Sequence, residues 1–204
     1  GGSIASFSSL RDEGRYTVAM ARVLESVAQR RFTVEEFHRM AETGILKPDE
    51  RVELIRGVIR EMSPKNWAHV IATKVIFRTL ENALLGRASV YQEAPLVAAG
   101  LDSEPEPDVL VCSNPDELAY RSSRTQALLV VEVAEASLAY DLGEKAGLYA
   151  QAGVPEYWVL DLVDRVLVVF REPVSGSYRL RLSLDETARV TPGPWPGLAF
   201  EVSK

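Results

Sequence analysis

Cysteine, long apolar runs and an excess of positive charge are what this chain of 204 residues lacks. The single Cys112 excludes an intramolecular disulfide framework and a zinc site built on several cysteines, and it favours a reducing compartment. No apolar run approaches the roughly 20 residues that cross a bilayer, and the N-terminus lacks the basic-then-apolar order of a secretory signal. We therefore expect a cytoplasmic protein that neither spans a membrane nor is exported.

Basic residues are outnumbered: 23 Lys and Arg stand against 29 Asp and Glu, which gives a formal net charge of -6. This balance argues against a protein that coats nucleic acid by bulk charge, although a local basic groove stays open. The 47% of apolar residues excludes a chain that is disordered throughout. The length fits one large domain or a domain with an extension.

The first residues are rich in Gly and Ser and show no sustained period, and Met20 follows them at a position suited to a start codon. We therefore predict that residues 1–29 are a flexible tail or an extension left by cloning. Residues 30–204 then form the folded domain. No internal repeat is visible in it.

Helix and turn signals divide the first half of this domain. Thr33 and Glu36 have the spacing of a capping box, which predicts a short helix that ends at Gly44. Two apolar runs around Arg56 predict a tight hairpin. Residues 66–86 carry apolar side chains around most of the helix circumference, so we expect a long, largely buried helix there.

The second half alternates between strand and helix patterns. Three runs rich in valine and leucine predict strands in residues 89–98, 107–112 and 127–134, and the last two look covered on both faces. A helix is predicted over residues 141–152, with Asp141 and Glu144 as its capping box, and further strands follow it. The order predicts an α/β (α+β) fold in which helices flank a mixed central sheet.

Two charged residues interrupt the apolar strands, where an ionised carboxylate is costly unless it is paired or binds metal. Glu132 shares a strand face with Leu128 and Val130 near the strand's C-terminal end, where open α/β sheets bind ligands. Asp108 opens the neighbouring run, and Pro107 places it at a strand entrance. Carboxylates on adjacent strands can share a divalent cation, and oxygen ligands suit Mg²⁺, Mn²⁺ or Ca²⁺ better than Zn²⁺.

Lys145 is a third charged residue where an apolar one is expected. Its spacing places it with Leu148 and Tyr149 on the helix face that packs against the sheet. The helix dipole also disfavours a cation in the first turns of the predicted helix. In one interpretation the lysine stem packs while its ammonium reaches solvent. In the other, the amine points inward and holds a water or a phosphate oxygen beside a metal ion.

The chain contains, in order, the segments RFTVEEFHRM, RVELIRGVIREMSP, PEPDVLV, VVEVAEAS and YDLGEKAGLYAQAGVPEYWVLD. Together they resemble the Uma-two family of the PD-(D/E)XK restriction-endonuclease-like superfamily, over about residues 30–200. The resemblance implies a restriction-endonuclease-like core and a site for Mg²⁺ or Mn²⁺. It also implies that the protein hydrolyses phosphodiester bonds of a nucleic acid, which we expect to be DNA.

The resemblance assigns roles to individual residues. Asp108 matches the aspartate of the PD element, and Glu132 matches the acidic residue of the (D/E)XK element. By superfamily analogy the main-chain carbonyl of Val133 is a third metal ligand. Ala134 stands where the superfamily pattern has its lysine, and Lys145 matches a lysine that has moved to the following helix.

Two further residues are carried over as candidates. Glu53 would complete the metal shell, and His69 matches a histidine at the start of the long helix. Without the resemblance, Glu53 would be interpreted as an exposed strand residue, and His69 would fit the core equally well. Asp141 is predicted to be a helix cap rather than a ligand, and Tyr149 and Trp158 to be core aromatics.

Three functional hypotheses follow. The first is a metal-dependent DNA endonuclease, expected to be a homodimer because a duplex has two strands to cut. Four basic side chains are expected to line the mouth of its site: Arg56, Arg60, Lys65 and Arg78. The second is a noncatalytic nucleic-acid-binding or assembly module, which the acidic net charge and Ala134 favour. The third is hydrolysis of a small phosphorylated molecule in a closed pocket.

Overall fold

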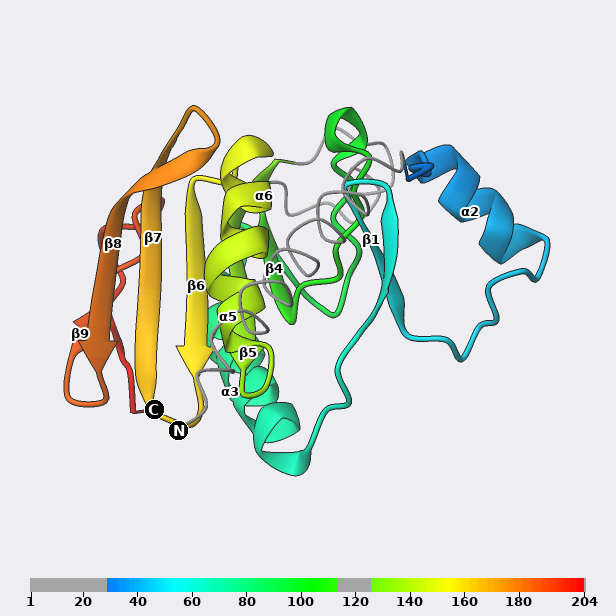
Figure 1. Ribbon diagram of the computed structural model, residues 1–204. Coiled ribbons are helices and arrows are strands. Elements are labelled where there is room, and N and C mark those ends of the chain that lie inside the picture. The colour runs from blue at the N-terminus through cyan, green and yellow to red at the C-terminus, as the bar shows by residue number, and fades with distance from the viewer. Residues whose placement is uncertain (1–28, 114–125, 204) are drawn as a thin grey trace, which may run out of the picture. The chain divides into compact units, whose positions relative to one another are not determined.

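A computed structural model describes residues 29–113 and 126–203 (Figure 1). The chain divides into two compact units, residues 1–31 and residues 32–204. The predicted tail, residues 1–29, lies outside the described residues except for Gln29. Every helix and strand among the described residues belongs to the second unit.

A six-stranded sheet forms the centre of this unit, in the order β3-β4-β5-β6-β7-β8. Its strands are β3 (Ser89–Gln92), β4 (Val109–Cys112), β5 (Ala127–Ala134), β6 (Glu156–Asp161), β7 (Val166–Val174) and β8 (Ser177–Asp185). Neighbours pair antiparallel except β5 and β6, which are parallel. A parallel pair needs a crossover connection, and helical residues 138–151 supply it. The predicted mixed sheet is confirmed.

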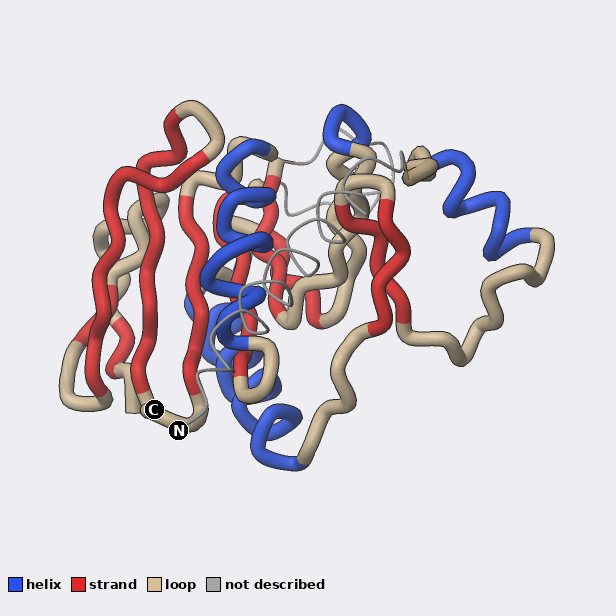
Figure 2. The backbone as a smooth tube through the Cα atoms, in the orientation of Figure 1, coloured by secondary structure: helices blue, strands red, loops and turns tan. Residues whose placement is uncertain are grey.

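Helices cover both faces of the sheet (Figures 1 and 2). On one face, α6 (Ala146–Gln151) brings Tyr149 into a core cluster with Val130 of β5. On the other face, α3 (Trp67–Ala83) packs Leu80 against Val131. Successive β5 residues thus enter opposite cores, which explains why this strand is almost continuously apolar.

Two small antiparallel pairs and a short helix complete the unit. Helix α2 (Val34–Glu42) has the predicted capping box, in which the Thr33 side chain accepts from the Glu36 N–H and the Glu36 side chain from the Thr33 N–H. Strands β1 (Val52–Ile55) and β2 (Val58–Glu61) form the predicted hairpin. Both turn residues, Arg56 and Gly57, have positive φ (50° and 75°), as a type I′ turn requires. The remaining elements are η1 (Ala99–Leu101), β9 (Arg189–Val190) and β10 (Phe200–Glu201).

The prediction of a largely buried long helix is wrong, although the helix and its Asn66 cap are confirmed. Only Thr73 and Leu80 of α3 are buried, because the helix packs on the sheet by one face. Trp67 is 79% exposed and Ile71 is 58% exposed. Apolar side chains therefore extend onto a helix face that the sheet does not cover. No helix within the described ranges combines the length and apolar content of a membrane span.

The predicted capping box at Asp141 is also wrong. Helical structure begins earlier, at α5 (Leu138–Tyr140), and continues through the π-helical turn η2 (Asp141–Lys145) into α6. Asp141 therefore lies inside the helical segment, where its carboxylate accepts a 2.6 Å hydrogen bond from the Ser137 hydroxyl. The earlier start also places Lys145 two turns into the segment, where the helix dipole opposes a cation less than expected.

A buried carboxylate that the sequence did not single out, Glu156, serves the fold. One of its oxygens accepts from Trp158 Nε1 at 2.6 Å and from Arg171 at 2.9 Å. The other accepts from the Gly193 N–H at 2.6 Å. This acid therefore fastens the C-terminal loop around Gly193 to the first residues of β6, at the other end of the strand pair from Glu132.

Candidate active site

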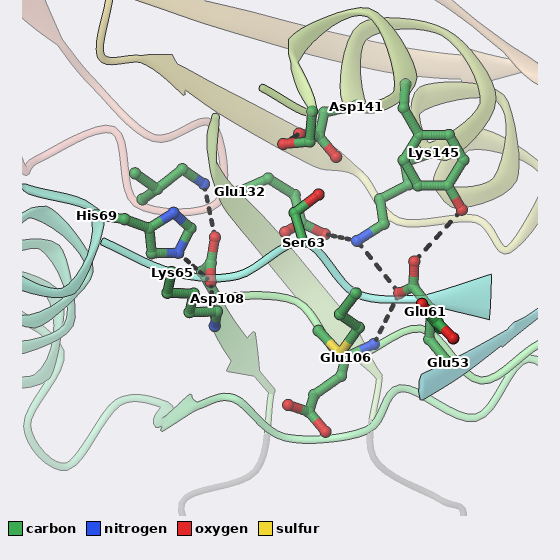
Figure 3. A pocket seen from close by; sticks show the side chains of 14 residues that line it. Glu53, Glu61, Ser63, Lys65, His69, Glu106, Asp108, Glu132, Asp141 and Lys145 are labelled. Carbon is green, nitrogen blue, oxygen red and sulfur yellow. Dashed lines mark hydrogen bonds and ion pairs between the residues drawn. The ribbon is translucent and has the colours of Figure 1, made fainter. Parts of the chain in front are cut away.

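A pocket forms where the entrance of β4, the end of β5, the β1–β2 hairpin and η2 meet (Figure 3). All five side chains proposed from the sequence line it: Glu53, His69, Asp108, Glu132 and Lys145. Six carboxyl groups and two lysines belong to its lining, the acids being Glu53, Glu61, Glu106, Asp108, Glu132 and Asp141. Residues from distant parts of the chain thus converge on one strongly acidic spot.

The sheet register sets the two central acids side by side. Strands β4 and β5 pair with Val109 opposite Val131, and the same register extended by one residue places Asp108 beside Glu132. Both carboxyl groups are buried, at 3% and 4% exposure. Directly opposed residues have Cβ atoms about 5 Å apart, which is a separation that one bound ion can bridge.

Asp108 is held from two sides. Its Oδ2 accepts a 2.8 Å hydrogen bond from the N–H of Val133, and its Oδ1 lies 2.8 Å from both Lys65 Nζ and His69 Nε2. Burial alone would raise the pKa of this carboxyl group, but the His69 hydrogen bond and the Lys65 charge outweigh it and hold the pKa below its usual value. Asp108 is therefore an anion that keeps a fixed orientation.

Glu132 shares its environment with an inward lysine. Lys145 Nζ lies 2.9 Å from Glu132 Oε1 and 3.2 Å from Glu53 Oε2, between the two acids (Figure 3). The Tyr149 hydroxyl donates to the same Glu132 oxygen at 2.8 Å. Lys145 is only 5% exposed and lines the pocket, so its ammonium points inward instead of into bulk solvent, and Ala134 is small and buried.

The acids around Lys145 outnumber the cation. Burial raises the pKa of Glu132 to about 8, although the Lys145 charge opposes the shift. Burial likewise raises the pKa of Asp141 to about 6. The lysine is itself buried, but Glu132, Glu53 and Asp141 hold its pKa above the ordinary value. Such shifts mark a site that holds more negative charge than its cations compensate.

Glu53 and Asp141 differ from their sequence-based interpretations. Glu53 is 4% exposed, so the alternative of an ordinary exposed residue is wrong. It receives long hydrogen bonds from the Tyr140 hydroxyl at 3.3 Å and the Glu106 N–H at 3.4 Å. Asp141 lines the pocket instead of capping a helix.

The loop before α3 contributes a residue that the sequence placed only at the rim. Lys65 enters the pocket and bonds both Asp108 and Glu93, at 2.8 Å and 2.7 Å. Of the four basic side chains expected around the mouth, it alone belongs to the described lining. Arg56 instead donates to Gln151, and Arg60 donates to Glu144. Arg60 also lies over the ring of Tyr140, which lines the pocket, at 5.3 Å, so it borders the mouth, whereas the basic rim as a whole stays a prediction.

The anchoring of α3 explains why His69 reaches the pocket. The Asn66 side chain accepts from the His69 N–H at 3.0 Å and donates to Glu135, which follows β5. The first turn of α3 is thus fastened to the strand end that carries Glu132. The sequence predicted the Asn66 cap but not the link to Glu135, because such a link depends on the tertiary arrangement.

The donor set fits a hard divalent cation. Within residues 29–113 and 126–203, no three His, Cys, Asp or Glu side chains are close enough to coordinate an ion by themselves. Mg²⁺ does not require such a cage, because it commonly binds through one or two carboxylates and keeps several waters. Asp108 and Glu132 supply two neighbouring carboxylates, and the surplus of acids favours a cation electrostatically.

Comparisons with known proteins agree with this picture. The family model described as "Uma2: Putative restriction endonuclease" matches residues 34–203. The fold is similar to the crystal structure of a putative nuclease belonging to DUF820 from Anabaena variabilis ATCC 29413, with a TM-score of 0.67. That match has 16% sequence identity and covers 84% of this chain and 96% of the other. Among curated proteins, no match was found.

Proposed function

This chain belongs to the Uma2 family of putative restriction endonucleases, and on that premise we propose that it is a metal-dependent endonuclease that hydrolyses DNA phosphodiester bonds. One observation carries the proposal: a single pocket gathers six carboxyl groups around two lysines, and its two central acids lie side by side on neighbouring strands. Such an arrangement is unfavourable unless a cation shares the site.

We assign the cation, Mg²⁺ or Mn²⁺, to the carboxylates of Asp108 and Glu132 and the main-chain carbonyl of Val133. When bound, the ion would lower the pKa of a water and stabilise the charge that develops on the phosphate. The N–H of Val133 and the ring of His69 fix the Asp108 carboxylate before substrate arrives. Tyr149 does the same for Glu132.

Lys145 is the residue we assign to the reacting groups. Its ammonium already lies between Glu132 and Glu53, from which it can orient a water or neutralise charge on a phosphate oxygen. Reaching the pocket from the helical crossover, it performs the role that a lysine at position 134 would have on the strand. Hydrolysis in this scheme needs no covalent enzyme intermediate.

The noncatalytic module is the second candidate, and one observation favours it. In the described residues both central acids already have internal cationic partners, Lys65 for Asp108 and Lys145 for Glu132. A protein that retained the fold for binding or assembly would need no ion there. We favour the nuclease because the acids outnumber these partners.

Two further expectations belong to the nuclease proposal. Cleavage of both strands of a duplex requires two sites, so we propose a homodimer as the acting species. We also propose that the protein works in the cytoplasm, where nucleic acid and Mg²⁺ are both present.

Plasmid cleavage tests the proposal directly. Supercoiled DNA incubated with the full chain and Mg²⁺ or Mn²⁺ should be nicked or linearised, and EDTA should stop the reaction. The same preparation in Ca²⁺ serves as a control, because Ca²⁺ also binds oxygen ligands but in a more variable geometry than Mg²⁺. Intact plasmid at millimolar Mg²⁺ and Mn²⁺, together with no calorimetric signal for either ion, would favour the noncatalytic module.

Lys65→Met should strengthen Mn²⁺ binding by about tenfold or more, because it removes a cation that competes for Asp108 Oδ1 at 2.8 Å. Isothermal titration of the metal-free protein measures the affinity without reference to activity. Lys74→Met, on the exposed side of α3, is the matched control and should leave the affinity unchanged. Weaker binding by Lys65→Met would show that this lysine positions Asp108 instead of competing with the ion.

A further inference from the structure

One face of α3 turns four side chains directly away from the sheet. These residues, which we call the outer stripe, follow one another at spacings of four, three and four: Trp67, Ile71, Lys74 and Arg78. Such spacings keep all of them within a narrow band of the helix surface. All four are exposed, whereas Thr73 and Leu80 on the opposite face are buried.

Trp67 is the unusual member of the outer stripe. It is 79% exposed, although a tryptophan is among the largest apolar side chains and is highly buried in most proteins. It belongs to the first turn of α3, between Lys65 and His69, and both of these neighbours bond Asp108. Because helical side chains lean toward the N-terminus, the indole lies at the end of α3 that borders the pocket.

The two cations extend the outer stripe away from the pocket. Lys74 and Arg78 follow Trp67 by about 10 Å and about 16 Å along the helix axis. Neither forms an ion pair with another residue in the described part of the chain. The cations in and beside the pocket, in contrast, are paired with acids: Arg60, Lys65 and Lys145. Glu81, three residues after Arg78, is the one acid on the same band of α3. In a chain of net charge -6, two cations that form no ion pair beside an exposed aromatic ring are complementary to a polyanion.

We propose that the outer stripe binds an unpaired segment of the nucleic-acid substrate, with one base stacked on Trp67 and backbone phosphates at Lys74 and Arg78. The inference rests on the proposed nuclease function and names its substrate class. Indole stacks on any base, but bases within a continuous duplex are covered on both faces by their neighbours. The preferred substrate is therefore a single strand, an overhang or a flap, cut near its unpaired part.

A second copy of the chain is the competing occupant, because Val70 and Val75 are also exposed beside Ile71 and would suit a protein interface. The positive charges of Lys74 and Arg78 favour a nucleic acid over a second copy of the chain. Two copies related by a two-fold axis over this face would bring Lys74 and Arg78 of both copies, four cations in all, into one interface. A nucleic acid backbone meets the same residues with opposite charge.

The test measures binding to the Asp108→Asn form of the full chain, so that no cleavage occurs during the titration. The probe is a fluorescein-labelled single strand of about 12 nucleotides, compared with a blunt duplex of equal length. Variants Trp67→Ala, Trp67→Phe and Lys74→Ala are added to this form. Leu85→Ala and Lys47→Ala, which are exposed elsewhere, are the matched controls. Sedimentation of every variant reports its oligomeric state.

We expect Trp67→Ala to weaken single-strand binding by about 5- to 100-fold and Trp67→Phe to retain most of the affinity. Single-strand binding should also quench intrinsic fluorescence, and Trp67→Phe should abolish that quenching. Unchanged affinity in Trp67→Ala overturns the inference, as does a change of oligomeric state without a loss of binding. Cleavage assays separate the two proposals. If binding depends on Trp67 but the wild-type chain cuts no DNA, only the proposed nuclease function is contradicted. If Trp67→Ala cuts single strands as fast as wild type, only the proposed role of the outer stripe is contradicted.

Discussion

Asp108→Asn should lower the rate of DNA hydrolysis by about 10³-fold or more while leaving the fold intact. The substitution keeps the shape of the side chain and its hydrogen bond from the Val133 N–H, but removes the charge that we assign to the cation. Plasmid nicking in Mg²⁺ measures the rate, and calorimetry with Mn²⁺ should show that the affinity of the ion falls with it. Circular dichroism confirms that the sheet and helices persist.

Glu156→Gln is the matched control, because it also neutralises a buried carboxylate of the same domain. Glu156 bonds Trp158 and Arg171 and does not line the pocket. This variant should unfold at lower denaturant concentration, yet each folded molecule should cleave at the wild-type rate. Cleavage that survives in Asp108→Asn, at a rate close to that of Glu156→Gln, would sink the assignment of the metal site.

The sequence predicted the sheet and the inward acids because their signals are local. A carboxylate within an apolar run is visible in one segment, as at Glu132, and a proline before Asp108 marks the entrance of a strand. The type I′ turn at Arg56 follows from two adjacent residues. In each case a few neighbouring side chains determine the conformation, so their order in the chain is sufficient.

Where the predictions failed, the deciding contact joins distant segments. Lys65 comes from an irregular loop, and nothing in its neighbours indicates that it will meet Asp108 and Glu93. Asp141 looks like a cap because Glu144 follows at the right spacing, but the structure extends the helix backwards to Leu138. The apolar side chains around most of α3 predicted that the helix is buried, but the outer stripe is exposed. Composition alone does not separate the two cases, because an exposed binding surface can be as apolar as a core.

The Lys145 ammonium compensates two buried acids of the pocket. It contacts Glu132 and Glu53, both about 4% exposed, and its side chain is equally buried. A buried pair adds little stability compared with apolar residues of the same shape, but removing one partner leaves the other charge uncompensated.

Above about pH 8, where Glu132 is ionised, Lys145→Met should lower the free energy of unfolding by about 3–5 kcal/mol, as expected when one partner of a buried ion pair is removed. Urea denaturation measures the loss, and Lys74→Met at an exposed position should change stability by about 0.5 kcal/mol or less. Adding Glu132→Gln to Lys145→Met should restore part of the loss, because the uncompensated carboxylate disappears. A single variant as stable as wild type would show that Lys145 does not compensate these acids.

The pH dependence of the same variant gives a second, independent outcome. In the wild type, burial raises the pKa of Glu132 to about 8, above its value in the unfolded chain, so the native state binds this proton more tightly than the unfolded state does. Without Lys145 the native pKa rises further. The destabilisation of Lys145→Met should therefore be smallest in mildly acidic solution and grow as the pH rises through about 8, and the double variant with Glu132→Gln should lose most of that slope. An equal slope in the single and double variants would place the titrating group elsewhere in the pocket, with Asp141 as the next acid to replace.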